Sequence, residues 1–210
     1  MKLKAFNLVE LLITLASIGV VAVLVVPNVV NHVYEKTNTE SLRINYSKID
    51  DAVKNALLDS KVSYWSDTNY VDDEDSIQKF FTDYMTVSII CDTTSDCFAE
   101  SYKTLDKSDF LFNTLYTFDT MLKLTSGASI AIKVPTMSDL GFILMDVNSL
   151  NPPNVLGRDL FYLEFDNKGN IGAMSAENTS SDDAFAKCVD AEDPVMCLYL
   201  VQSDGWAPIK

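Results

Sequence analysis

The hydrophobic positions of this chain are concentrated at its N-terminus, where residues 6–30 form an almost wholly apolar run. A few polar side chains interrupt the run: Asn7, Glu10, Thr14, Ser17 and Asn28. About 20 apolar residues are enough for a helix to cross a bilayer, so residues 6–30 are predicted to form a transmembrane helix. Because Lys2 and Lys4 precede the run, the positive-inside rule places the N-terminus in the cytoplasm and the later residues outside.

After residue 30 the pattern changes to that of an amphipathic helix. Apolar side chains recur at alternating spacings of four and three: Leu42, Tyr46, Ile49, Val53 and Ala56. This is the period of a helix that buries one face. We therefore expect residues 31–61 to continue the helix, which as a single rod from 6 to 61 would be about 84 Å long at about 1.5 Å per residue. Its second half is expected to pack under a globular domain.

Residues 62–210 have the pattern of a compact domain. Apolar residues at helical spacing, from Ile77 to Met85, predict a short helix. Segments 129–134, 142–147 and 160–165 are rich in β-branched and aromatic residues and predict strands, and 166–170 reads as a hairpin turn. Short connections favour an antiparallel sheet of three or four strands over about residues 128–174. The predicted fold class is α+β, with the long N-terminal helix packed on this sheet.

Composition narrows the function. The 210 residues carry 16 Lys plus Arg against 30 Asp plus Glu, a formal charge of −14. A nucleic-acid binder needs a positive surface, so no nucleic acid is predicted as a direct partner. His32 is the single histidine, and no phosphate-binding loop, nucleophile elbow or dinucleotide fingerprint is present. The chain is therefore predicted not to be an enzyme.

Glu10 distinguishes between interpretations of the apolar helix. A cleaved secretory signal has a shorter apolar core followed by a small-residue cleavage site, which the Pro27-Asn28 pair does not provide. A plain signal anchor explains everything except Glu10. A carboxylate inside a membrane costs about 2.5–3.5 kcal/mol even on lenient scales, and Lys4 is the only basic residue within one or two turns. Glu10 therefore requires a partner.

At its N-terminus the chain resembles the type IV pilin and pseudopilin family, and the matching string is KAFNLVELLI at residues 4–13. The resemblance implies that residues 1–5 are a leader, that a prepilin peptidase cuts between Ala5 and Phe6, and that the new amino group of Phe6 is methylated. It also implies that this ammonium neutralises Glu10 of a neighbouring subunit. Gly19 and Pro27 match further family positions within the helix.

Two positions depart from the family pattern: Ala5 stands where the family prefers Gly, and Asn7 where Thr is commoner. The resemblance implies a structural subunit of a type IV pilus, or of a type II secretion or competence pseudopilus. Its implied partners are the peptidase, other pilin-like subunits and an inner-membrane assembly platform. The subunit would cross the cytoplasmic membrane once, with the C-terminal domain exported, before entering a filament. The alternative is an uncleaved, membrane-anchored binding protein that does not polymerise.

Along the sequence the four cysteines lie as two pairs of near neighbours, Cys91 with Cys97 and Cys188 with Cys197. Four cysteines allow three pairings. An exported domain lies in an oxidising compartment, so the even number indicates disulfides. Pairing between neighbours is the preferred option, and it defines a C-terminal disulfide region.

A possible calcium site is predicted on the loop after the second strand. It collects oxygen donors of the kind that calcium prefers: Asp146, Asn148, Asn151 and Asp159. Some pseudopilins, which this chain resembles, have a calcium-binding loop beside the sheet. Asn and Asp also bond to the backbone in ordinary turns, and this alternative remains open.

Overall fold

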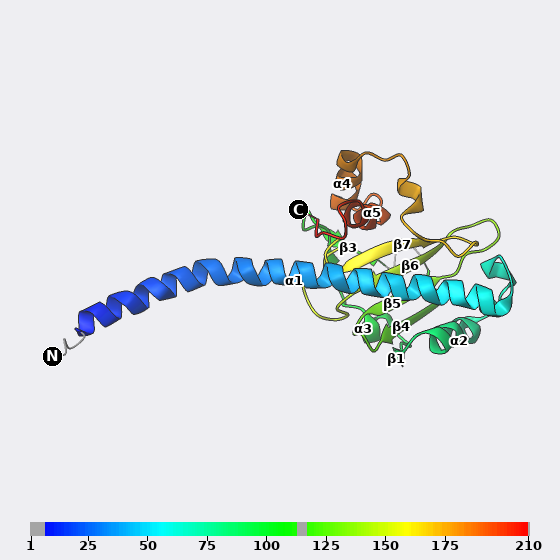
Figure 1. Ribbon diagram of the computed structural model, residues 1–210, viewed down its shortest axis with the longest axis horizontal. Helices are drawn as coiled ribbons and strands as arrows, with labels where there is room; N and C mark the ends of the chain where they lie inside the picture. Colours follow the sequence, from blue (N-terminus) through cyan, green and yellow to red (C-terminus); the bar gives the residue numbers. More distant parts are fainter. Residues whose placement is uncertain (1–6, 113–116, 210) are drawn as a thin grey trace. The chain divides into compact units, whose positions relative to one another are not determined.

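The structure is a computed structural model that describes residues 7–112 and 117–209, without the side chains of Pro27, Asn28 and Asn31 (Figure 1). The cleavage position between Ala5 and Phe6 lies outside the described residues. The chain divides into two units, Met1–Thr37 and Asn38–Lys210, which are described separately. One helix, α1 (Leu8–Ser60), contributes to both.

In its described residues from Leu8 on, the first unit is the N-terminal part of α1. A span long and apolar enough to cross a membrane runs over Leu8–Val26, and none of it is buried. The polar side chains within this span are accommodated by the helix itself, since the hydroxyls of Thr14 and Ser17 donate to the carbonyls of Leu11 and Ile13. The structure confirms the apolar N-terminal helix that the sequence predicts.

The second unit begins with the amphipathic part of α1. Leu42, Ile49, Val53 and Ala56 are fully buried, as the predicted stripe requires. Tyr46, the remaining member of the stripe, is half-buried and donates its hydroxyl to the Ile171 carbonyl at 2.7 Å. These buried residues belong to the same hydrophobic core as the strands, and α1 lies across the sheet (Figure 1).

The main sheet has six antiparallel strands in the order β1-β4-β5-β6-β7-β8. They are β1 (Val87–Ile90), β4 (Thr120–Leu124), β5 (Ser129–Lys133), β6 (Gly141–Asp146), β7 (Leu160–Phe165) and β8 (Ile171–Gly172). All six residues of β7 are buried. Since successive side chains of a strand point to opposite faces, both faces of the sheet are covered there. Helix α5 packs against β7.

Shorter elements complete the domain. A small second sheet pairs β2 (Tyr102–Lys103) with β3 (Asp109–Phe110). The helices after α1 are η1 (Trp65–Asp67), α2 (Glu74–Tyr84), α3 (Thr94–Cys97), η3 (Met174–Ala176), α4 (Ser181–Val189) and α5 (Val195–Ser203). Helix α2 begins where Asp73 accepts a hydrogen bond from the Ser76 amide at 2.8 Å, an N-cap arrangement.

The α+β class is confirmed, and one part of the expectation is corrected. The predicted strands become β5, β6 and β7, and the predicted turn leads into β8. The sheet is larger than the expected three or four strands over 128–174, because β1 and β4 extend it at the β5 edge. The alternation of buried and half-buried residues in β4 is that of a strand. The helix predicted from Ile77 to Met85 is α2, which buries Ile77, Phe80 and Phe81.

Candidate functional site

Glu10 lies in the first turn of α1, among exposed apolar side chains. Its Oε2 accepts a hydrogen bond from the Asn7 amide at 3.3 Å, which is favourable because the first amides of a helix lack intrahelical acceptors. Among residues 7–112 and 117–209 no Lys, Arg or His forms an ion pair with it. The carboxylate therefore has local hydrogen bonding but no cation from the described part of its own chain.

Gly19 and Pro27 both lie within α1, and their role in assembly stays a prediction. A Cβ added to Gly19 would meet no heavy atom within 4 Å, so the small size of this residue serves no packing need within the described chain. Small residues on apolar helices allow another backbone to approach closely. Pro27 removes one helical hydrogen-bond donor.

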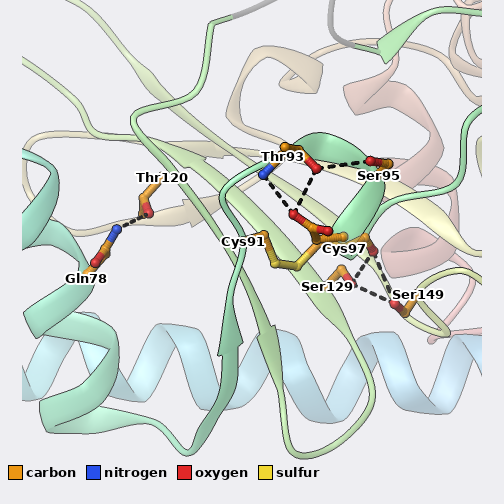
Figure 2. The surroundings of a disulfide bond; sticks show 9 residues. Gln78, Cys91, Thr93, Ser95, Cys97, Thr120, Ser129 and Ser149 are labelled. Carbon is orange, nitrogen blue, oxygen red and sulfur yellow. Dashed lines mark hydrogen bonds between the residues drawn. A yellow bond between two sulfur atoms is a disulfide. The ribbon is translucent and has the colours of Figure 1, made fainter.

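Two disulfides connect neighbouring cysteines. Cys91 pairs with Cys97 and Cys188 with Cys197, with Cα–Cα distances of 6.1 and 5.0 Å. This is the pairing that the sequence analysis prefers. The first disulfide closes the α3 segment beside the sheet (Figure 2), and the second joins α4 to α5.

The 146–159 loop connects β6 to β7 and encloses two buried carboxylates. Asp146 accepts a hydrogen bond from the Asn148 amide at 3.0 Å, and its other oxygen accepts from the hydroxyl of Tyr102. Asp159 accepts from the amides of Asn154 and Val155 at 2.7 and 2.6 Å. Both Asp side chains are fully buried. Backbone amides of the loop therefore donate hydrogen bonds to both buried carboxylates.

Burial changes the ionisation of both acids. Removal from water, opposed by the hydrogen bond from Tyr102 and aided by the nearby charge of Asp159, raises the pKa of Asp146 to about 7. Burial likewise raises the pKa of Asp159 to about 6, against the opposing effect of the Val155 and Asn154 amides. The pKa of Tyr102 is raised by its burial and by the Asp146 charge. Near neutral pH the two acids therefore titrate in the folded protein.

The predicted calcium ligands are only partly brought together. Asn148 donates to an oxygen of Asp159 at 3.5 Å, so these two and Asp146 share one loop interior. Asn151 is exposed, and its side-chain Nδ2 donates to the Asn148 carbonyl at 2.9 Å. The described residues contain no group of three or more His, Cys, Asp and Glu able to hold a metal.

The donor chemistry nevertheless fits a hard cation. The Oδ1 atoms of Asn148 and Asn154 are buried and have no hydrogen-bond partner within the described residues. Unsatisfied buried oxygens are costly, and together with two carboxylates they are the ligand types that calcium prefers. Asp146, Asp159, Asn148 and Asn154 would hold such an ion, so Asn154 replaces Asn151 in the candidate set. Calcium binding stays a prediction.

Sequence reasoning missed Tyr102, Ser129 and Ser149. The hydroxyls of both serines lie beside the carbonyl of Cys97, at 2.6 and 3.1 Å (Figure 2). Tyr102 lies 44 positions before its partner Asp146. No local pattern marks these residues, because each acquires its role through a contact between distant segments.

Comparison of the chain with protein-family models, curated proteins and solved structures returned no match. The classification therefore depends on the chain itself. It is an α+β protein with an N-terminal apolar helix followed by an antiparallel sheet and two disulfides, which is compatible with a pilin-like architecture. The apolar helix and the disulfides together indicate a membrane or exported protein.

Proposed function

We propose that this chain is a pilin-like structural subunit of a type IV pilus, or of a type II secretion or competence pseudopilus. The observation that carries the proposal is a carboxylate, Glu10, in the first turn of a helix whose span Leu8–Val26 is apolar and has no buried residue. A helix that is apolar all round must be covered by lipid or by other protein. A carboxylate in such a helix needs a cation from outside the described chain.

The proposed mechanism is mechanical and includes no catalytic step by this chain. A prepilin peptidase cuts before Phe6 and leaves a new terminal ammonium. Within a growing filament this ammonium of one subunit pairs with Glu10 of its neighbour. Because an unpaired charge is costly in an apolar surrounding, a subunit in the wrong register is disfavoured, and the pair sets the position of each new subunit.

The apolar surface of α1 supplies the cohesion. In the membrane, lipid covers side chains such as Leu12, Ile18 and Val23, which are all exposed within the chain. When the assembly platform moves the helix out of the bilayer, neighbouring subunits must cover the same surface. Each fully buried side chain of this size contributes about 1.5–3 kcal/mol. Gly19 would permit close approach of a neighbouring helix, in a homo- or hetero-filament.

The test uses the full chain in cells that carry its assembly machinery. Replacing Glu10→Ala is expected to block or misregister filament assembly, while the exported domain remains folded with both disulfides formed. Sheared filaments are quantified by immunoblot, and the folded state is followed by resistance to protease. Glu40→Ala is the matched control, since Glu40 is an exposed acid on the same helix whose visible ion pair is a surface contact with Arg43 at 3.7 Å.

Intact mass of the chain from native membranes separates this proposal from its rival. A chain that starts at Phe6 with one added methyl group supports processing by the prepilin route. A chain that still starts at Met1 supports a membrane-anchored binding protein that does not polymerise. Normal filaments from the Glu10→Ala variant would refute the registering role of this carboxylate.

A further inference from the structure

The segment from Cys97 to Lys103 contacts the 146–159 loop along much of its length. It leaves α3 at the first disulfide and ends in β2. Three separate contacts connect it to the loop: one at the Cys97 carbonyl, one at the Tyr102 hydroxyl and one at the Lys103 backbone. The first two lie near the start of the loop and the third near its end.

The first contact is a buried cluster of three oxygens. The hydroxyls of Ser129 and Ser149 lie 2.9 Å apart, and both approach the Cys97 carbonyl (Figure 2). Each hydroxyl has one proton to donate, and both serines are placed to direct it to the Cys97 carbonyl, so Ser149 adds a second hydrogen bond to the one that Ser129 already supplies. Ser149 is fully buried and has a φ of 59°, an uncommon conformation for a residue other than glycine. Its contact with Cys97 therefore holds the loop in a conformation that it would otherwise rarely adopt.

The second contact involves Asp146 directly, and the third holds the backbone next to Asp159. Tyr102 accepts a hydrogen bond from the Ala99 amide at 3.2 Å and donates to Asp146. The Lys103 amide donates to the Asn154 carbonyl at 2.9 Å, and the Leu156 amide donates to the Lys103 carbonyl at 2.9 Å. The segment thus fixes the backbone on which Asn154 presents its amide to Asp159.

The first disulfide fixes the start of this segment. Cys91 follows the edge strand β1, and its amide donates to the Met121 carbonyl at 2.9 Å. Between the cysteines, Thr93 and Asp96 form a capping box that holds the short helix α3. A helix of this length is not stable alone, and the covalent link to Cys91 ties its end, Cys97, to the residue that follows β1.

We propose that the Cys91–Cys97 disulfide and Tyr102 are positioning elements of the 146–159 loop, so that the loop is ordered only in the oxidised chain. Oxidation proceeds by exchange with a disulfide donor of the exported compartment. The Cys91–Cys97 bond forms, the donor's sulfur–sulfur bond breaks, and the donor takes up both protons and two electrons as a dithiol. Export across the membrane would thereby determine when the surface around this loop takes its final form.

Hydrogen exchange of the full chain in detergent, followed by mass spectrometry, tests the proposal. In the Cys91→Ser/Cys97→Ser variant the amides of Asn148, Asn154 and Val155 are expected to exchange roughly five- to thirtyfold faster, as loss of one or two net hydrogen bonds predicts. Exchange in β6 and β7 is expected to stay unchanged. The Cys188→Ser/Cys197→Ser variant is the comparison, and its effect on the loop is expected near Gly157, which lies against those sulfurs.

A second variant decides the case if the double variant fails to fold. Tyr102→Phe keeps the disulfide and the ring contact with Phe112 and removes only the hydroxyl. Its control is Tyr162→Phe, which removes a buried hydroxyl bonded to the Phe112 carbonyl at 3.0 Å. Faster exchange of the loop in Tyr102→Phe alone supports the proposal. An unchanged loop, equal acceleration in the control, or acceleration spread over the whole sheet overturns it.

Discussion

The two parts of helix α1, before and after Asn38, differ in which surroundings cover their apolar side chains. From Leu8 to Thr37 no described side chain is buried, although the span Leu8–Val26 is apolar on every face. From Asn38 to Ser60 the buried residues follow a helical period, and Leu42, Ile49 and Val53 enter the core of the domain. The first part is thus a surface that needs an external partner, and the second finds its partner within the chain.

This difference shows what a helix pattern can reveal about partners. An amphipathic stripe predicts a core in the same chain, because only one face needs cover. A helix that is apolar all round predicts a surrounding of lipid or other subunits. The first unit has the proposed assembly function, and the second is the folded domain that would be displayed on the filament. The variants below separate the two roles.

The largest expected effect compares one isoleucine from each part. Ile49 is fully buried and Ile18 is 65% exposed. Ile49→Ala is expected to destabilise the domain by about 2–5 kcal/mol, since it leaves a cavity in the core. Ile18→Ala is expected to change the domain stability by less than about 0.5 kcal/mol, and to lower filament yield instead. Thermal unfolding of the full chain in detergent, followed by near-UV circular dichroism, measures the first quantity.

The comparison fails if the two substitutions act alike. Equal loss of stability would mean that residues before Asn38 support the domain directly. Unchanged filament yield in Ile18→Ala, with Ile49→Ala as destabilising as expected, would mean that this exposed side chain is not part of the subunit contact. The filament yield of the Glu10→Ala variant provides the reference value for loss of assembly.

Sequence periodicity predicted the helical stripe because every member lies within a few turns of the next. Ile49 and Val53 need no distant residue to be recognised. In contrast, β1 and β4 were missed, although β4 alternates like a strand, since their pairing joins Ile90 to Leu122 across a long separation. The Tyr102–Asp146 contact was missed for the same reason. Contacts of this kind depend on which distant segments come together in the fold, which local patterns do not encode.

A smaller effect is expected at the turn that packs on the second part of α1. Gly169 has a φ of 82°, and an added Cβ would lie 2.5 Å from Leu57 Cδ1 and 3.1 Å from Val53 Cγ1. Gly169→Ala is therefore expected to cost about 1–3 kcal/mol through crowding, in addition to backbone strain. Urea unfolding of the fragment 38–210, which contains the described core, measures the change.

Gly127→Ala is the matched control for this turn. Gly127 has a φ of 92° and open space around the added Cβ, so its substitution reports backbone strain alone, about 1 kcal/mol. The difference between the two variants is the contribution of the contact with α1. An equal loss of unfolding free energy at both positions would show that the turn around Gly169 gains no stability from packing against α1.

The last expected effect is a pH dependence that arises from two acids of the second unit. Burial raises the pKa of Asp146 to about 7 and that of Asp159 to about 6, above the values near 3.9 expected for the unfolded chain. A raised carboxyl pKa means that the folded state binds more protons than the unfolded state between these values. The resulting stabilisation is complete below about pH 4 and is lost as pH rises through 6 to 7.

The fragment 38–210 is therefore expected to resist urea better at pH 5 than at pH 8. Asp146→Asn is expected to flatten the profile between pH 6 and 8, whereas Asp139→Asn, at an exposed acid, is expected to leave it unchanged. If the loop binds calcium, adding this ion at pH 8 restores stability, because a cation compensates two ionised carboxylates that are close together. Magnesium serves as the control, since its smaller octahedral shell fits a dehydrated loop poorly. A flat profile in the unmodified fragment would show that water reaches both acids and that the loop interior is open in solution.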